Sequence, residues 1–188
     1  MSDECKKAYL NIEREIDAAR RLPRNVFRAQ WGRFYLFDPD WMFEGAFVPK
    51  VSSLLDIEGA QCACIVNLDL DKGVDNCASK FLIDRHSTKD EFQNLLRGTN
   101  ANDGWVYNMD RFGCVSEKAL WCIYCERPSE LAVLGIKQGM QYETYGPVLE
   151  SLCAGRVSDV ANGVAAYEFC SHSLSREWQE EILKEYGV

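Results

Sequence analysis

The chain has 188 residues and a mass of 21.5 kDa, which suits one domain with a sizeable core, or at most two small domains. Apolar residues make up 47% and charged residues 27%, so the composition excludes disorder over the whole chain and collagen-like repeats. The 29 acidic and 21 basic residues give a formal charge of −8, the wrong sign for a general nucleic-acid binder, because phosphates are neutralised by Lys and Arg.

Hydrophobic periodicity and turn residues define the elements of the first half of the chain. In chain order these are a helix over residues 3–21, a strand over 33–37, short helices over 39–43 and 48–55, strands over 62–68 and 81–83, and a helix over 89–97. Pro23 ends the first helix, and Asp38-Pro39-Asp40 forms a turn. Thr88 and Glu91 form a capping box at the start of the last of these helices.

The second half contains the clearest local structure, a β-hairpin. The predicted elements are strands over 105–109 and 114–117, the hairpin strands over 120–126 and 130–136, a helix from Pro147 to about Gly155 and a helix over 175–186, whereas 158–170 fits helix and strand equally. Both faces of the first hairpin strand are apolar, which predicts a central strand covered on both sides. We therefore expect a single α+β domain over 1–188, with an antiparallel or mixed sheet, a central hairpin (about 120–136) and flanking N- and C-terminal helices.

Cysteine usage and the N-terminal sequence both indicate a cytoplasmic protein. Residues 1–7 are charged without an apolar stretch behind them, and no window reaches 18 apolar residues, so we expect neither a signal peptide nor a membrane span. The nine cysteines are expected to stay reduced. Cys62, Cys64, Cys122 and Cys125 could supply four thiolates to zinc, but strand alternation places the last two on opposite faces. Buried thiols are the favoured interpretation, and metal binding by these four stays open.

Several catalytic and binding motifs are excluded. Cys170 and His172 are close in sequence, but neither they nor His86 lie in a known catalytic signature. The chain has no P-loop and no Gly-x-Gly-x-x-Gly run. The loop over 69–75 begins like an EF-hand, which requires Gly at position six and Glu at position twelve. This loop instead has Gly73 at position five and Lys80 at position twelve. We therefore expect no cofactor and no metal.

Two features could carry a function. Asp38, Asp40 and Glu44 lie among aromatic residues that could stack on sugars, which is the best enzymatic arrangement in the chain and would suit a small hydrolase. The other feature is the clustering of acidic residues, which either keeps the surface soluble or docks a basic partner. The candidate partner-binding residues are Asp69, Asp71, Asp75, Glu126 and Glu130, with the aromatic anchors Trp105, Tyr107 and Tyr124.

Residues 120–136 and 37–43 resemble small acidic cytosolic bacterial immunity proteins, which neutralise polymorphic or contact-delivered toxins. The resemblance carries over no functional residue. It implies a non-enzymatic antidote that binds and occludes a cognate protein toxin. Because this chain is acidic, we expect the toxin to be basic, and we expect no nucleic-acid or membrane partner. The alternatives are a small hydrolase at Asp38, Asp40 and Glu44, or a non-catalytic subunit of a larger assembly. The oligomeric state is left open.

Overall fold

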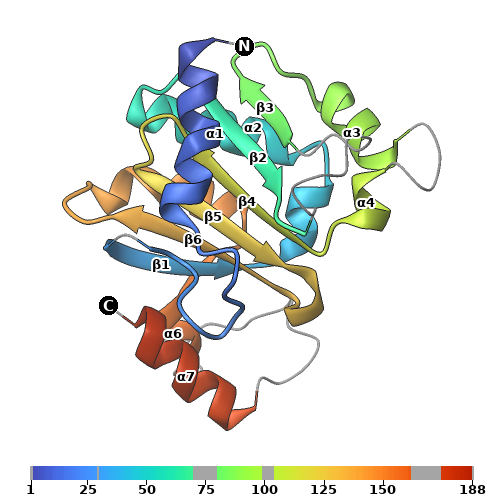
Figure 1. Ribbon diagram of the computed structural model, residues 1–188. Coiled ribbons are helices and arrows are strands. Elements are labelled where there is room, and N and C mark those ends of the chain that lie inside the picture. Colours follow the sequence, from blue (N-terminus) through green and yellow to red (C-terminus); the bar gives the residue numbers. More distant parts are fainter. Residues whose placement is uncertain (1, 29, 70–79, 99–103, 162–174, 188) are drawn as a thin grey trace.

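One antiparallel sheet forms the centre of the computed structural model, which describes residues 2–28, 30–69, 80–98, 104–161 and 175–187 (Figure 1). In these residues the sheet has seven strands in the order β3-β2-β4-β5-β6-β1-β7, and every neighbouring pair is antiparallel. The strands are β1 (Trp31–Phe37), β2 (Cys62–Asn67), β3 (Lys80–Asp84), β4 (Arg111–Ser116), β5 (Trp121–Glu126), β6 (Leu131–Lys137) and β7 (Gly155–Arg156). The predicted α+β fold with a central hairpin is confirmed, because β5 and β6 pair in the middle of the sheet.

Helices cover both faces of this sheet (Figure 1). One face packs against α1 (Asp3–Glu15), α6 (Val157–Ala161) and α7 (Arg176–Tyr186). The other packs against α2 (Phe47–Glu58), α3 (Lys89–Arg97), α4 (Trp105–Asn108), α5 (Gly146–Ser151) and the 3-10 helices η1 (Pro39–Phe43) and η3 (Tyr142–Tyr145). A third 3-10 turn, η2 (Arg127–Ser129), joins β5 to β6.

The central strands are buried on both faces. Every residue of β4 and β5 is buried. Along β5 the side chains alternate, so that Trp121 and Ile123 enter the layer beneath α2 while Cys122 and Tyr124 enter the layer beneath α1. The prediction of a central strand covered on both sides is therefore confirmed.

Side-chain caps fix several helix ends. The capping box is present, since Thr88 Oγ1 accepts from Glu91 N and Glu91 Oε2 accepts from Thr88 N. Ser2 and Ser175 cap α1 and α7 with single side-chain bonds, accepting from Cys5 N and Trp178 N. The last helix of the chain lies where its amphipathic pattern predicts it.

The first helix is shorter than predicted. It ends at Glu15 rather than at residue 21, because Ile16 turns into extended backbone and forms an isolated bridge with Phe27. Residues 17–28 then run back along the sheet toward β1, held where Arg28 N donates to Glu15 O at 2.8 Å. The apolar periodicity continues beyond Glu15, but pairing with the returning chain replaces the helix.

The predicted strand over 105–109 is wrong, since Trp105 to Asn108 form α4. Aromatic and β-branched residues favour strands locally, but this preference yields to packing, and Trp105 is fully buried in the helical layer. The strand that follows is longer than predicted, because β4 begins at Arg111 and not at residue 114. Of the ambiguous segment, residues 158–161 are helical and residues 162–170 lie outside the described part.

Tyr186 joins the last helix to the segment that precedes β1. Its buried hydroxyl accepts from Val26 N at 3.0 Å and donates to Arg24 O at 2.7 Å. The ring packs edge-on against Phe34, with ring centres 5.0 Å apart. Both the hydroxyl and the ring therefore hold α7 in place.

We expect Tyr186→Phe to lower the free energy of unfolding by about 1–3 kcal/mol, because Val26 N and Arg24 O lose a partner in a buried place. Tyr145→Phe is the matched control. Tyr145 is also fully buried, and its hydroxyl has no hydrogen-bond partner among the described residues, so its removal should be neutral or stabilising. Urea unfolding of the three proteins measures both effects, and equal losses in the two variants would contradict the assignment.

Candidate functional site

Acidic side chains from four separate turns meet at one end of the sheet. Asp38 and Asp40 follow β1, Asp69 follows β2, Asp110 precedes β4, and Glu130 precedes β6. The antiparallel pairing brings these strand ends together, since Phe37 pairs with Ala132, Arg111 with Glu126, and Asn67 with Phe112. We call the set Asp38, Asp40, Asp69, Asp110 and Glu130 the acidic rim.

Backbone contacts connect the turns that carry Asp69, Asp110 and Glu130. Asp69 Oδ2 accepts from the backbone N–H of Asp110 at 3.1 Å and of Arg111 at 2.6 Å. The carbonyl of Asp110 accepts from Arg127 N at 2.9 Å, and Glu130 N donates to Arg127 O at 2.8 Å. The turns between β2, β4, β5 and β6 therefore hold one another in place.

Two arginines lie beside the acidic rim, and both are engaged. Arg111 is buried and forms an ion pair with Asp69, with Nε 2.6 Å from Oδ1, and its Nη1 donates to Ala18 O. Arg127 donates to Val106 O and lies over the ring of Phe43. The exposed side chains of Asp40, Asp110 and Glu130 leave this end of the sheet acidic.

Electrostatic repulsion acts within the acidic rim at Asp38. Partial burial raises the pKa of this carboxyl, and the like charges of Asp40 and Glu130 raise it further, although a hydrogen bond from the Asp40 backbone opposes the shift. Burial is the largest cause of this shift, and the smaller effects of Asp40 and Glu130 show that the three carboxylates lie near one another.

Among the predicted partner-binding residues, those that the structure describes lie at this end of the sheet, but they differ in exposure. Asp69 and Glu130 belong to the acidic rim and lie at the surface. Glu126 is buried, with its carboxylate accepting from Arg21 Nη1, Leu22 N and Tyr124 Oη. Trp105 and Tyr124 have no exposed surface, so they belong to the core and present nothing to a partner.

The remaining predicted residues, Asp71, Asp75 and the side chain of Tyr107, lie outside the described part of the chain. Asp110 was missed, although its place directly after the predicted strand over 105–109 and before the next one is a signal that could have found it. Asp38 and Asp40 were assigned to a different hypothesis, the hydrolase.

The hydrolase arrangement is only partly assembled. Asp38 and Asp40 are neighbours, but Asp38 Oδ1 accepts from Asp40 N at 2.8 Å and so caps η1. Trp41 is covered by Lys50, whose Nζ lies 4.2 Å from the ring centre. Glu44 is exposed, and its negative charge raises the pKa of Lys50. The turn therefore has a structural explanation, and its aromatic rings are occupied by the chain's own cations.

The four zinc-candidate cysteines do not converge. Cys122 and Cys125 lie in the opposite apolar layers of the sheet, as strand alternation predicted. Within the described residues, no three His, Cys, Asp or Glu side chains are placed to hold a metal ion. No helix in the same residues is long and apolar enough to cross a membrane.

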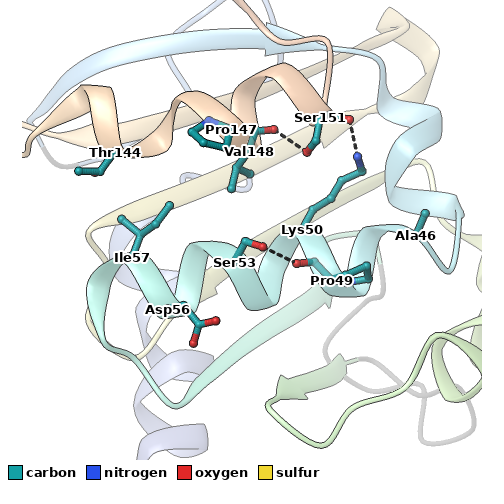
Figure 2. Close-up of a pocket in the computed structure, with 10 residues that line it drawn as sticks. All are labelled: Ala46, Pro49, Lys50, Ser53, Asp56, Ile57, Thr144, Pro147, Val148 and Ser151. Atoms are coloured by element: carbon teal, nitrogen blue, oxygen red, sulfur yellow. Dashed lines mark hydrogen bonds between the residues drawn. The ribbon is translucent and has the colours of Figure 1, made fainter.

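A groove of about 560 Å³ lies between α2 and α5 (Figure 2). Ala46, Pro49, Ser53 and Ile57 form one wall at helical spacing, a stripe of small and apolar side chains that could have been found in the sequence. Lys50 reaches across the groove to donate to the Ser151 carbonyl, and burial lowers the pKa of its ammonium group. None of the predicted partner-binding residues lines this groove.

A perturbed carboxyl lies at the opposite end of the sheet from the acidic rim. Glu58 ends α2 and is buried, and burial raises its pKa from 4.5 to about 7. Hydrogen bonds from Ser116 and from the Leu120 backbone lower the pKa, as does Lys118, whereas Glu117 raises it. Glu58 fastens α2 to the turn between β4 and β5, which is a structural task.

Comparisons of the chain with known protein families, with curated protein sequences and with solved structures give no match.

We expect Glu58→Gln to remove a pH dependence of stability. Because the folded pKa lies above the unfolded one, the folded state holds the proton more tightly, and this stabilising contribution is lost as the pH rises from about 4.5 to about 7. The loss is about 3 kcal/mol at most. Thermal melts between pH 4 and 8 should show the fall in the wild-type protein and a flatter profile in the variant. Parallel profiles would contradict the assignment to Glu58.

Proposed function

We propose that this protein is a cytosolic immunity or inhibitor protein that binds a basic protein toxin and occludes its active site. The single observation that supports the proposal is the acidic rim, where five carboxylates from four turns lie at one end of the sheet. The resemblance of residues 37–43 and 120–136 to immunity proteins points in the same direction, because both segments border this end.

Charge of one sign at a fixed end of a rigid sheet steers a partner of opposite sign and fixes the orientation in which it docks. Toxins that act on anionic substrates carry basic clefts, which the acidic rim complements. An antidote of this kind needs no catalytic group, because a bound protein that covers the cleft excludes the substrate.

The rigidity of the acidic rim supports this use. The turns that carry Asp69, Asp110 and Glu130 are joined by the backbone contacts described above. A preorganised surface loses less conformational entropy on binding than a loose loop does. The charges can therefore contribute to binding with little rearrangement.

The first experiment is capture of partners from a lysate of the source cell, at low and at moderate salt, with the tagged protein as bait. We expect one stoichiometric polypeptide that is basic, that is toxic when expressed alone and that is harmless when co-expressed with this chain. A captured partner that is neither basic nor toxic would contradict the proposal.

With the partner in hand, Glu130→Lys should slow association on the order of ten-fold at low salt and weaken its salt dependence, because the steering field is reduced. Asp56→Lys is the matched control. It makes the same change of charge at an exposed position, in the last turn of α2 at the other end of the sheet, where a lysine suits the helix dipole. Stopped-flow binding measures both rates, and equal effects of the two variants would exclude the acidic rim as the docking surface.

A further inference from the structure

Two thiols meet where the first turn of α1 crosses the beginning of β2. Cys5 and Cys62 line the same small pocket, of about 190 Å³, together with Asp84, Arg85 and His86. Both are free cysteines. The acidic rim lies at the other end of the sheet, so this pair is independent of the proposed function.

The fold brings both thiols to the same pocket. Cys62 and Cys64 point to the face of β2 that is covered by α1, and Cys5 lies in the first turn of α1, where its N–H donates to the capping Ser2 at 3.3 Å. The Cys5 side chain acts on the pKa of the Cys62 thiol, and both side chains line the same pocket, so the two thiols lie near each other. Proximity of two thiols on packed elements is the arrangement from which a disulfide forms with little backbone movement.

The two thiols differ in access. Cys5 is 9% exposed and opens to the pocket, whereas Cys62 is 1% exposed. Burial raises the pKa of the Cys62 thiol, so this group stays protonated. The neighbouring Cys5, Cys64 and Glu117 raise this pKa further. An oxidant that enters the pocket therefore meets Cys5 first, with Cys62 directly behind it.

We propose that Cys5 and Cys62 are a peroxide-sensitive dithiol that forms a reversible disulfide between α1 and β2. The Cys5 sulfur attacks one peroxide oxygen, the O–O bond breaks, and a sulfenic acid forms as the other oxygen leaves as water. The Cys62 sulfur then attacks the sulfenic sulfur, and the displaced hydroxyl takes the Cys62 proton and leaves as a second water. Two thiols and one peroxide thus give one disulfide and two waters.

The disulfide fastens the first helix to the sheet. It closes a loop that contains β1 and α2, which restricts the unfolded chain and stabilises the folded one. We expect oxidation to raise the melting temperature on the order of 5–10 °C, and a dithiol reductant to reverse the rise.

The test treats the reduced, full-length protein with a stoichiometric amount of hydrogen peroxide, alkylates the remaining thiols and digests with trypsin without reduction. We expect the peptide that ends at Lys6 to be linked to the peptide over 51–72, with a mass lower by two hydrogens than the sum of the two. Recovery of Cys5 as the alkylated or sulfinic form, without this link, would overturn the proposal.

Matched variants identify the second cysteine, because Cys62 and Cys64 lie in the same tryptic peptide. The link should disappear in Cys62→Ala and persist in Cys64→Ala, which changes the same face of the same strand. It should also persist in Cys153→Ser, which removes an exposed thiol elsewhere. A link that persists in Cys62→Ala would overturn the assignment.

Cys5→Ser provides a second measurement if Cys62→Ala folds poorly, since this change lies in the first turn of a helix. Its melting temperature without peroxide should stay close to that of the wild-type protein, and peroxide should no longer raise it. A rise equal to that of the wild-type protein would overturn the proposal.

Discussion

Burial of the central sheet on both faces is the constraint on which the rest of this structure depends. β4 and β5 expose no residue, so each face must be covered by a helical layer over its whole length. The chain meets this demand by placing α1 and α7 on one face and α2, α3 and α5 on the other. The covering elements come from both halves of the sequence. Local segments of the chain can therefore reach their final form only when the sheet assembles.

Polar groups at the ends of the strands accommodate this burial in two ways. Glu126 and Arg111 turn inward and bind the segment between α1 and β1. Glu126 accepts hydrogen bonds from Arg21 and Leu22, and Arg111 donates one to Ala18. Neighbouring carboxylates turn outward and form the acidic rim. A charged residue at a strand end can thus fasten a loop or face a partner, and the difference is decided by whether the chain supplies a donor beside it.

The sequence predicted the elements whose signals are local. The hairpin followed from two apolar runs around Arg127-Pro128-Ser129, and the helix after Thr88 followed from its capping box. The sequence-based prediction failed where distant contacts override the local preference for helix or strand. Trp105 has a side chain that favours strands, yet it anchors a short helix because the core beneath α4 receives its ring. Of the predicted acidic residues, Asp69, Glu126 and Glu130 lie at one end of the sheet, but Glu126 is buried there and Asp110 was not foreseen.

By itself the sequence determined that the chain is acidic, that it forms one α+β domain, and that its central strand is apolar on both faces. These properties depend on composition and on the period of side chains along a strand, which are local. Only the tertiary structure decided which carboxylates reach the surface together, and that Cys5 meets Cys62. Antiparallel pairing joins strand ends that are far apart in sequence, as it does for Asp69 and Asp110. Sequence distance carries no information about such contacts until the order of the strands is known.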